Sequence, residues 1–554
     1  MRAPGWGWGL GVLLIGAAAL SSAGLTADLP YPRLGIERLH VQLAVKYGSG
    51  DLNPHFFIHP PLLSYLLFGL YGMAFVIGRG VGWVHSLAEF ERIYFTDPTV
   101  FFVIARVFIL AVALGGVVCF YLAAKRLFGN PVAWIAALLC AYAPEFVKWS
   151  HYALPTILMF GLFMASFYFV AGILRRGRWS DYLAAGVLGG LATAAKYDGA
   201  LIVFPLVTAH AMAARSAGRP WLDRRLLAAL MSMGAGFLCG APYTVLDAGQ
   251  FLKDWSLLNQ IAVQGQMTAP GWRIDKPGWL YIVWDALPFG WGLPVAMLGL
   301  LGIVHALRRR SQPDLVLLSV IAVALAYISR WQVINPRYFI QVFPFMALLG
   351  VDWLVGLTSG VRSARARRIL VGVGTALLLL VPLKESSAFA RQVSGRPLHF
   401  EVKQWIEAAI PSGASIVSLT DLPLVPNAVS ITRQLRDIEG KGLGRGIRLQ
   451  RLLRYLEAFP VTYDFTVLPF PSMAEYEPAD FNFEQQMRQG VQYVLLSQEI
   501  EEYQAEPHTF GVQLDYVGRV EQACRLLREF RRPWLAIEPP MSSADEFVRV
   551  YRCQ

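Results

Sequence analysis

Residues 101–123 read FFVIARVFILAVALGGVVCFYLA and hold a single charged side chain, Arg106. A helix needs about 20 mostly apolar residues to cross the hydrocarbon core of a bilayer. This run is long and apolar enough to predict a membrane-spanning helix. The whole chain agrees, because 55% of its 554 residues are hydrophobic and 16% are charged, whereas soluble domains carry about 25% charged residues.

Similar apolar windows recur before residue 385 and predict about eleven membrane spans. The windows lie near residues 6–24, 101–123, 132–149, 155–174, 181–195, 199–214, 226–245, 280–305, 313–329, 338–356 and 369–383. The first window follows Met1 and Arg2 and ends in small residues, so a cleaved signal peptide is the alternative for it. We expect it to be kept as a span, because the alternation of charged loops requires it.

Lys and Arg residues gather in alternate loops, which the positive-inside rule places in the cytoplasm. These loops lie near residues 2, 125–126, 175–178, 215–225, 308–310 and 362–368. The N-terminus is then cytoplasmic, and an odd number of spans places the chain beyond about Leu383 outside. The net charge of +11 reflects this topology, so we predict no nucleic-acid partner. Abundant Arg, Ala and Gly favour a bacterial source, and hence the bacterial cytoplasmic (inner) membrane.

The first outer loop, about residues 25–100, is predicted to form a structured platform. Residues 61–78 are apolar enough to cross the membrane, but a crossing would break the alternation of charged loops. We therefore expect this helix to lie on the outer face or dip into it. Residues 36–47, IERLHVQLAVKY, mix apolar and polar positions as an amphipathic interfacial helix does. A second outer loop, 247–279, is too long for a plain connection, and such loops are usually functional or disordered.

Beyond residue 384 the composition becomes that of a soluble domain. Helix-like and strand-like segments alternate, with a helix around 402–409, strands in ASIVSL (414–419) and VQYVLLS (491–497), and a further helix over 517–530. The pattern predicts a small α/β domain. We expect a membrane domain over 1–384 and an extracytoplasmic α/β domain over 385–554.

Cys524 and Cys553 both fall in the predicted extracytoplasmic domain. An oxidising compartment allows two cysteines to form a disulfide. The sequence does not show how far apart they lie, so a disulfide and two free thiols are equally open.

The chain contains none of the common soluble catalytic motifs, such as G-x-x-x-x-G-K-[ST], H-E-x-x-H or G-x-S-x-G. Ionisable groups at the membrane face are then the best candidates for function, because charges at a bilayer are costly to keep. On the predicted outer face these groups are Asp28, His55, His59, Lys196, Asp198, Arg273, Lys276, Arg330 and Arg337. His55 and His59 have no third ligand at a matched spacing, so we predict no metal site. We expect no other cofactor.

Several motifs follow one another in a recognisable order. They are Asp28, GDLNPHFFIHPPLLSYLL (50–67), WSHYALP (149–155), ATAAKYDGAL (192–201), PYTVLD (242–247) and NPRYFIQVFPFMALLG (335–350). In this order and orientation the chain resembles the GT-C glycosyltransferases related to the protein O-mannosyltransferases and the lipid A aminoarabinose transferase. The resemblance implies the GT-C fold and a metal-independent, inverting transfer of a sugar from a polyprenyl-phosphate donor to an acceptor on the outer face. The acceptor, whether glycan, lipid or protein, stays open.

The resemblance makes Asp28 the predicted catalytic base that takes the proton of the acceptor hydroxyl. Its relatives often carry Glu at the position of Leu29 and Asp at the position of Thr156. These departures leave Asp198 and Asp51 as alternatives for a share of the role.

Lys196 and Arg337 match family positions, and their charges suit the departing lipid phosphate. The alternative is that both are interfacial anchors reaching the headgroups. Arg273 and Lys276 are weaker candidates for substrate binding, since solvated loop charges are common. His55, His59 and Asp198 complete the set of predicted substrate-binding residues. Arg106 is expected to play a structural part instead, paired with an outer-loop carboxylate such as Glu91 or Asp97.

Two other functions remain open. A catalytically inactive GT-C relative that acts as a lipid-binding or partner protein would explain Leu29 and Thr156. A transporter or flippase would show paired discontinuous helices in two related halves, and no such internal symmetry is visible in the sequence. Membrane lipids are expected partners in every case.

Overall fold

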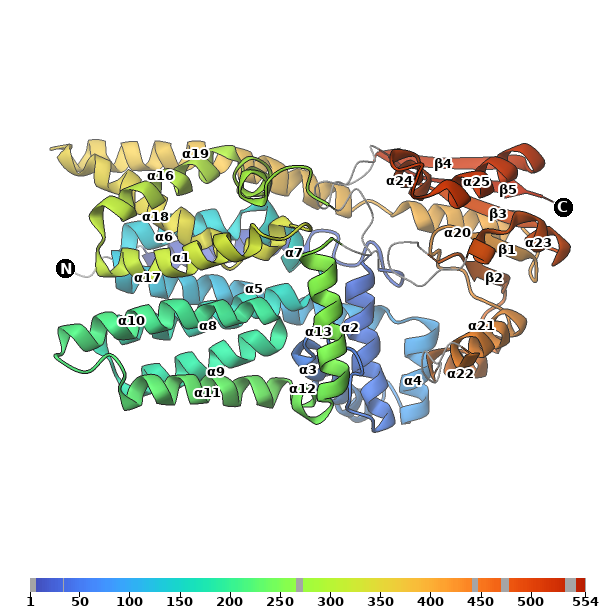
Figure 1. Ribbon diagram of the computed structural model, residues 1–554, viewed down its shortest axis with the longest axis horizontal. Coiled ribbons are helices and arrows are strands. Elements are labelled where there is room, and N and C mark those ends of the chain that lie inside the picture. Colours follow the sequence, from blue (N-terminus) through green and yellow to red (C-terminus); the bar gives the residue numbers. More distant parts are fainter. Residues whose placement is uncertain are drawn as a thin grey trace.

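The computed structural model describes residues 6–32, 34–265, 273–440, 447–469, 478–533 and 545–553. Long helices fill one end of the molecule and a mixed sheet lies at the other, with a layer of helices between them (Figure 1). The fold is mostly helical, as predicted. It consists of a helical bundle, a platform and a C-terminal α/β part.

The helical bundle contains helix in every predicted apolar window. Its helices are α1 (Trp6–Ser22), α5 (Thr99–Phe128), α6 (Asn130–Ala141), α7 (Pro144–Ser150), α8 (Pro155–Arg176), α9 (Trp179–Ala195), α10 (Val203–Ser216), α11 (Arg224–Gly240), α14 (Gly278–Tyr281), α15 (Leu287–Trp291), α16 (Leu293–Arg309), α17 (Gln312–Ile328), α18 (Phe343–Leu357) and α19 (Ala364–Val393). The positions of the predicted windows therefore agree with the structure.

Length and hydropathy alone select fewer spans than the eleven predicted windows. Within the described ranges, six helices are long and apolar enough to cross a membrane, or seven if α6 and α7, bent by 58°, count as one span. Other helices of the bundle, such as α9 and α11, are 17 residues long. They run alongside the longer ones (Figure 1). The chain is a multi-pass membrane protein.

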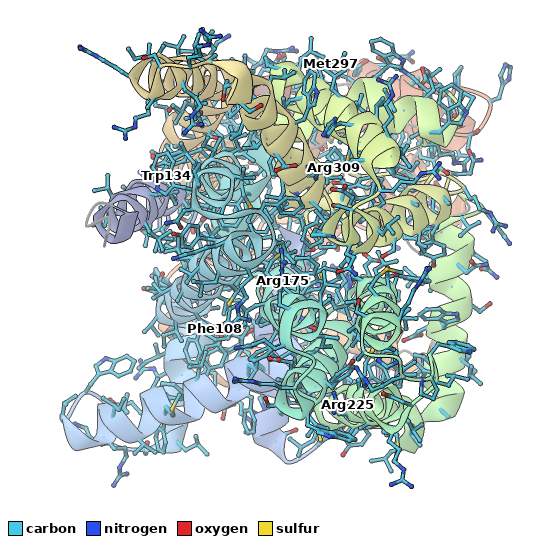
Figure 2. The ribbon with its side chains drawn as sticks, turned by 90° about the vertical axis from the view of Figure 1, so that its left-hand side faces the viewer. Phe108, Trp134, Arg175, Arg225, Met297 and Arg309 are labelled. Carbon is cyan, nitrogen blue, oxygen red and sulfur yellow. A yellow bond between two sulfur atoms is a disulfide. The ribbon has the colours of Figure 1, made fainter. Side chains whose placement is uncertain are left out.

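The basic loops predicted to be cytoplasmic lie at one end of the bundle. Figure 2 looks onto this end, with Arg175, Arg225 and Arg309 labelled among the helix ends. The helix α1 begins at the same end in Figure 1. The alternation of charged loops in the sequence therefore corresponds to one face of the molecule.

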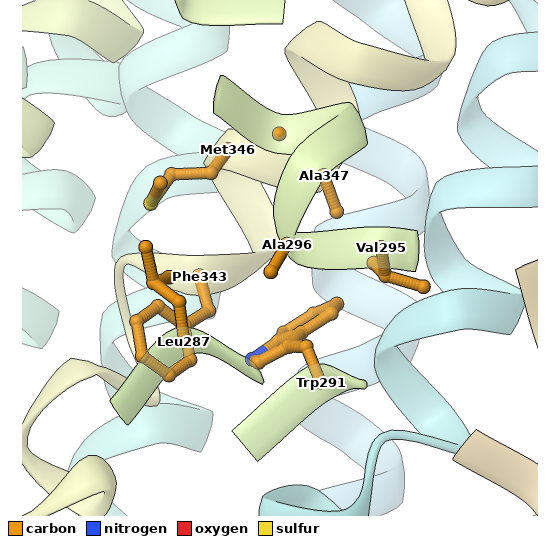
Figure 3. Close-up of a pocket in the computed structure, with 8 residues that line it drawn as sticks. Leu287, Trp291, Val295, Ala296, Phe343, Met346 and Ala347 are labelled. Atoms are coloured by element: carbon orange, nitrogen blue, oxygen red, sulfur yellow. The ribbon is translucent and has the colours of Figure 1, made fainter. Parts of the chain in front are cut away.

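Glycines bring neighbouring helices of the bundle into close contact. A Cβ atom at Gly190 of α9 would lie 2.0 Å from the backbone oxygen of Met233 on α11, and a Cβ at Gly236 would lie 2.4 Å from that of Val187. Membrane helices pack through such small residues because lipid gives little hydrophobic drive for their association. A small apolar cavity of about 10 Å³ remains between α15, α16 and α18, lined by Trp291, Phe343 and Met346 among others (Figure 3).

The platform consists of α2 (Gly35–Lys46), α3 (Leu62–Gly80), α4 (Leu87–Thr96), α12 (Tyr243–Leu246) and α13 (Ala248–Ala262). Figure 1 shows α2, α4 and α13 running across the direction of the bundle, with α3 seen nearly along its axis. The helix α3 is long and apolar enough to span a membrane, but it does not run along the bundle helices (Figure 1); that residues 61–78 lie on the outer face stays a prediction.

The turn before α3 forms as the sequence indicates. The backbone N–H of Asn53 donates to Asp51 Oδ1 at 3.0 Å, and that of His55 donates to Asn53 Oδ1 at 3.0 Å. The proline pair at 60 and 61 then leads into the first turn of α3.

The C-terminal part has a five-stranded sheet in the order β2-β1-β3-β5-β4. Its strands are β1 (Ser415–Ser418), β2 (Asp464–Val467), β3 (Tyr493–Ser497), β4 (Arg525–Pro533) and β5 (Asp545–Arg552). The first three are parallel to one another, and β5 is antiparallel to both β3 and β4. The helices of this part are α20 (Leu398–Ala409), α21 (Ala428–Gly440), α22 (Ile447–Arg454), α23 (Phe483–Arg488), α24 (Glu499–Ala505) and α25 (Gly511–Ala523).

One predicted helix in this part is wrong. Residues 517–530 were expected to be helical, but α25 ends at Ala523 and residues 525–533 form β4. Pairing with β5 decides the strand, and this partner lies later in the chain. Cys524 and Cys553 form a disulfide that joins the start of β4 to the end of β5.

Candidate functional site

Lys196 and Arg337 come together where the bundle meets the platform. Lys196 follows the last residue of α9, and Arg337 lies in a short 3-10 helix, Pro336–Phe339, before α18. The Lys196 ammonium lies 4.6 Å from the centre of the Tyr338 ring, and the Arg337 guanidinium carbon lies 5.7 Å from it. Two cations 141 positions apart in the sequence therefore share one aromatic side chain.

Trp149 connects Arg337 to a third cation, Lys148. The Arg337 guanidinium carbon lies 5.1 Å from the centre of the Trp149 ring, and the Lys148 ammonium lies 5.0 Å from it. Lys148 also forms a 2.5 Å ion pair with Glu145, one turn earlier on α7. Both residues of this pair are buried.

The sequence analysis missed Lys148 and Glu145, because both lie inside the apolar window 132–149. The sequence nevertheless held a signal that could have identified them. Two opposite charges three positions apart in an apolar run are costly in a membrane and usually functional.

His59 joins the same cluster. Burial lowers its pKa well below the ordinary value, and the nearby charges of His40, Lys196 and Arg337 lower it further. The imidazole is therefore neutral at physiological pH, and it lies close enough to both cations to interact with their charge. The structure thus brings together three predicted substrate-binding residues, Lys196, Arg337 and His59. We call these three residues together with Lys148 the cation cluster.

Asp198 accompanies Lys196 as its ion-pair partner within the motif KYDG. The short 3-10 helix Tyr197–Ile202 holds the two side chains on one side. A Cβ at Gly199 would lie 2.3 Å from the backbone of Ala192, so glycine is required for this turn. An anion that binds Lys196 would thus share it with the Asp198 carboxylate.

His55 lies elsewhere, in an exposed turn. Its Nε2 lies 3.0 Å from Asp51 Oδ2 and its Nδ1 lies 3.8 Å from Asp247 Oδ2. The amide of Asn53 donates to the same Asp247 oxygen at 2.8 Å. These contacts join the first outer loop to the start of α13, and none of them involves a residue of the cation cluster.

Lys276 and Arg273 lie at the end of the second outer loop. A hydrogen bond with Asp285, at 3.0 Å, raises the pKa of Lys276 above its ordinary value. Arg273 is exposed beside Gly265 and Gln332. Residues 266–272 of this loop lie outside the described part of the chain.

Asp28 is buried in an ion pair with Arg106. Arg106 Nη1 donates to Asp28 Oδ1 at 2.7 Å and Nη2 donates to Oδ2 at 3.2 Å. The same guanidinium donates to both oxygens of Glu37, at 2.8 and 2.7 Å. Asp28 is 5% exposed, while Arg106 and Glu37 are fully buried. One arginine thus holds two carboxylates, from the end of the first span and from α2.

Arg106 does pair with carboxylates of the first outer loop, as predicted, but the two residues named as examples were wrong. Glu91 instead pairs with Arg451 of α22 at 3.1 Å, and Asp97 accepts from the backbone N–H of Thr99 at the start of α5. The reason lies in the placement of α2. Its buried face carries Glu37 to the guanidinium, and the sequence alone does not show how an interfacial helix is rotated.

The segment Trp149–Ala153 connects the cation cluster to the Asp28 pair. Trp149 stacks on the cluster, and the backbone N–H of Ala153 donates to Glu37 Oε1 at 2.9 Å. His151 lies between these two residues in the chain. Burial and the charge of Arg106 lower its pKa to about 4, although the charge of Asp28 acts in the opposite direction. The motif WSHYALP therefore links the predicted phosphate-binding residues to the predicted base.

Within the described ranges, no three His, Cys, Asp or Glu side chains come together in a way that could hold a metal ion. The cluster is instead rich in cations and aromatic rings. Such a set suits an anionic group, since Lys and Arg bind phosphate through charge-assisted hydrogen bonds.

Residues 98–244 match the family model of the dolichyl-phosphate-mannose-protein mannosyltransferases. This range holds Arg106, Lys148 and Lys196, while Asp28 and Arg337 lie outside it. Among curated proteins, none matches the chain by sequence.

The fold matches crystal structures of ArnT from Cupriavidus metallidurans. For the apo state the TM-score is 0.54 with 15% identity, over 98% of both chains. For the state bound to undecaprenyl phosphate the TM-score is 0.52, also with 15% identity over 98% of both chains. A weaker likeness, with a TM-score of 0.42, links 73% of this chain to 60% of the Archaeoglobus fulgidus oligosaccharyltransferase. The predicted resemblance to GT-C proteins is confirmed.

Proposed function

We propose, from the GT-C fold that this chain shares with ArnT, that it is a membrane glycosyltransferase that uses a polyprenyl-phosphate sugar as donor. The observation that carries the proposal is the cation cluster. Lys148, Lys196 and Arg337 converge with the neutral His59 around Trp149 and Tyr338. A site of this composition suits the phosphate group of a lipid carrier.

The cluster has the chemistry that sugar transfer needs. The acceptor oxygen forms a bond to the anomeric carbon as the bond from that carbon to the phosphate oxygen breaks. The lipid phosphate leaves with the bonding electrons, so its charge grows in the transition state. Cations fixed around the phosphate stabilise this charge, and Arg337 can do so through two parallel hydrogen bonds.

Asp28 is proposed as the base that takes the proton of the acceptor hydroxyl. The Arg106 guanidinium favours the ionised carboxylate, which is the form that can accept a proton. Attack from the side opposite the departing phosphate inverts the anomeric centre. The segment Trp149–Ala153 would keep the base and the phosphate site at a constant separation.

The same proposal includes the orientation and the division of the chain. The basic end of the bundle in Figure 2 would face the cytoplasm of a bacterium. The cation cluster and the α/β domain, over 385–554, would then lie outside the inner membrane. The disulfide between Cys524 and Cys553 supports this, because disulfides persist in oxidising compartments. The acceptor could be a glycan, a lipid or a protein.

A second candidate function is a catalytically inactive relative that binds a lipid carrier. The observation that favours it is the Asp28 pair, because both carboxylate oxygens already accept hydrogen bonds from Arg106. In this case the cation cluster would bind polyprenyl phosphate without any transfer.

One experiment separates the two functions. Purified protein in lipid nanodiscs is given polyprenyl-phosphate sugars with a membrane extract as acceptor source, and the release of polyprenyl phosphate is measured. We expect release by the parent, a large loss in Asp28→Asn, and weakened donor binding in Lys196→Met. Lys384→Met is the matched control, since the Lys384 side chain is 80% exposed and pairs with Glu385. Donor binding without release by the parent would support the inactive relative instead.

A further inference from the structure

His40 is a buried histidine that the proposed reaction has not used. It lies on α2 and is 1% exposed. Burial lowers its pKa to about 4, so the imidazole is neutral at physiological pH. A neutral imidazole carries one N–H donor and one acceptor nitrogen, and its neighbours decide which nitrogen bears the hydrogen.

Ser64 is the neighbour that faces His40 Nδ1. Its hydroxyl lies 3.1 Å from that nitrogen, and it also hydrogen-bonds with the Tyr47 side chain. A buried hydroxyl donates its hydrogen where an acceptor is at hand. With Ser64 as donor, Nδ1 accepts and the hydrogen of His40 is on Nε2.

His40 Nε2 is buried and has no hydrogen-bond partner in the described part of the chain. A buried donor without an acceptor is unfavourable, and native proteins seldom keep one without a reason. The ring that bears it lies 5.8 Å, centre to centre, from the ring of His59, a member of the cation cluster. The donor therefore lies next to the place where the proposed function puts an anion.

We propose that His40 is a further ligand-binding residue, whose Nε2–H donates to an oxygen of the lipid-linked phosphate while Ser64 holds the ring in the required tautomer. This inference rests on the proposed function, because it assigns a donor to the same phosphate site. His40 would complement the cations with a neutral donor that needs no counter-charge. Ser64 acts through His40 and is a positioning residue.

The test uses the full-length protein in nanodiscs and measures the Kd of undecaprenyl phosphate. His40→Met keeps a side chain of similar bulk without the donor, and we expect the Kd to rise roughly 10- to 100-fold, as for the loss of a hydrogen bond to a charged group. His40→Gln can place an amide N–H near the position of Nε2–H, so it should recover most of the affinity. His85→Met, at an exposed histidine, is the control.

Ser64→Ala gives a second readout that a purely structural role would not produce. It should raise the Kd in the parent and have no further effect in the His40→Met background, because Ser64 acts only through the ring. Thermal unfolding of each variant shows that it is folded. Unchanged Kd in folded His40→Met would overturn the inference. If Lys196→Met still weakens binding in that case, the proposed function stands; if it does not, the phosphate site itself is wrong.

Discussion

Arg106 is the residue on which two buried carboxylates depend. Asp28 and Glu37 both accept hydrogen bonds from its guanidinium, and all three side chains are buried. Removing the arginine would leave two negative charges without a partner away from water. Breaking a buried ion pair from one side costs about 3–5 kcal/mol.

We therefore predict that Arg106→Met destabilises the protein strongly. The measurement is the thermal unfolding temperature in detergent, compared with Arg362→Met at an exposed position. Adding Glu37→Gln to Arg106→Met should recover part of the loss, because one unpaired charge is removed. An unfolding temperature equal to that of the Arg362→Met control would show that the carboxylates do not need the guanidinium.

His40 also predicts a pH dependence of stability. Its pKa is about 4 in the folded chain and 6.5 ordinarily, so between these values the unfolded chain binds more protons than the folded one. The neutral His40 therefore makes its full contribution to the free energy of unfolding above pH 6.5. This contribution, roughly 3 kcal/mol, is lost as the pH falls toward 4. Unfolding measured from pH 7 to 4 should show a shallower decline in His40→Gln than in the parent. Parallel curves for the two proteins would contradict the assignment.

At the scale of elements, the packing of α9 on α11 depends on glycine. A Cβ at Gly190 meets the Met233 backbone oxygen at 2.0 Å, whereas a Cβ at Gly234 of α11 meets nothing within 4 Å. Alanine favours a helix over glycine by about 0.5–1 kcal/mol where space allows. The two glycines therefore form a matched pair for substitution.

We predict opposite outcomes for the two alanine variants. Gly190→Ala should lower the unfolding temperature, since forcing extra atoms into a packed contact costs about 1–3 kcal/mol. Gly234→Ala should leave it unchanged or raise it slightly. Equal effects of both would mean that α9 and α11 can separate without cost.

Elements also differ in how far the sequence could predict them. The strands over 414–419 and 491–497 were predicted because each is a short apolar run bounded by turn residues. The strand β4 was not predicted, because residues 517–530 looked helical and the pairing of β4 with β5 depends on residues 545–552, later in the chain. Local pattern decides an element only where no distant partner competes with it.

At the scale of the whole molecule, the α/β domain is joined to the platform by polar and aromatic contacts. Arg38 of α2 pairs with Asp421 at 2.6 Å. Phe95 of α4 stacks on Tyr455, with ring centres 5.6 Å apart. Figure 1 shows α21 and α22 beside α4 at this junction. The junction lies on the same platform that carries His40 and His59.

We predict that the aromatic stack contributes more to this junction than the ion pair. Arg38 and Asp421 are 37% and 56% exposed in their side chains, and exposed pairs contribute about 0–1 kcal/mol. Hydrogen exchange of α4 should rise clearly in Tyr455→Ala and hardly change in Asp421→Asn. If hydrogen exchange of α4 rose strongly in Asp421→Asn and not in Tyr455→Ala, the ion pair would be the larger contribution.

The sequence by itself determined the membrane character, the positions of the apolar windows and a change of composition after residue 384. These properties depend on hydropathy, charge and turn residues that neighbour one another in the chain, so they can be read locally. Only the tertiary structure decided that Lys148, Lys196, Arg337 and His59 meet around two aromatic rings, and that Arg106 holds Asp28 with Glu37. These groups are far apart in the chain, and the rotation and packing of helices, which bring them together, depend on the whole bundle at once.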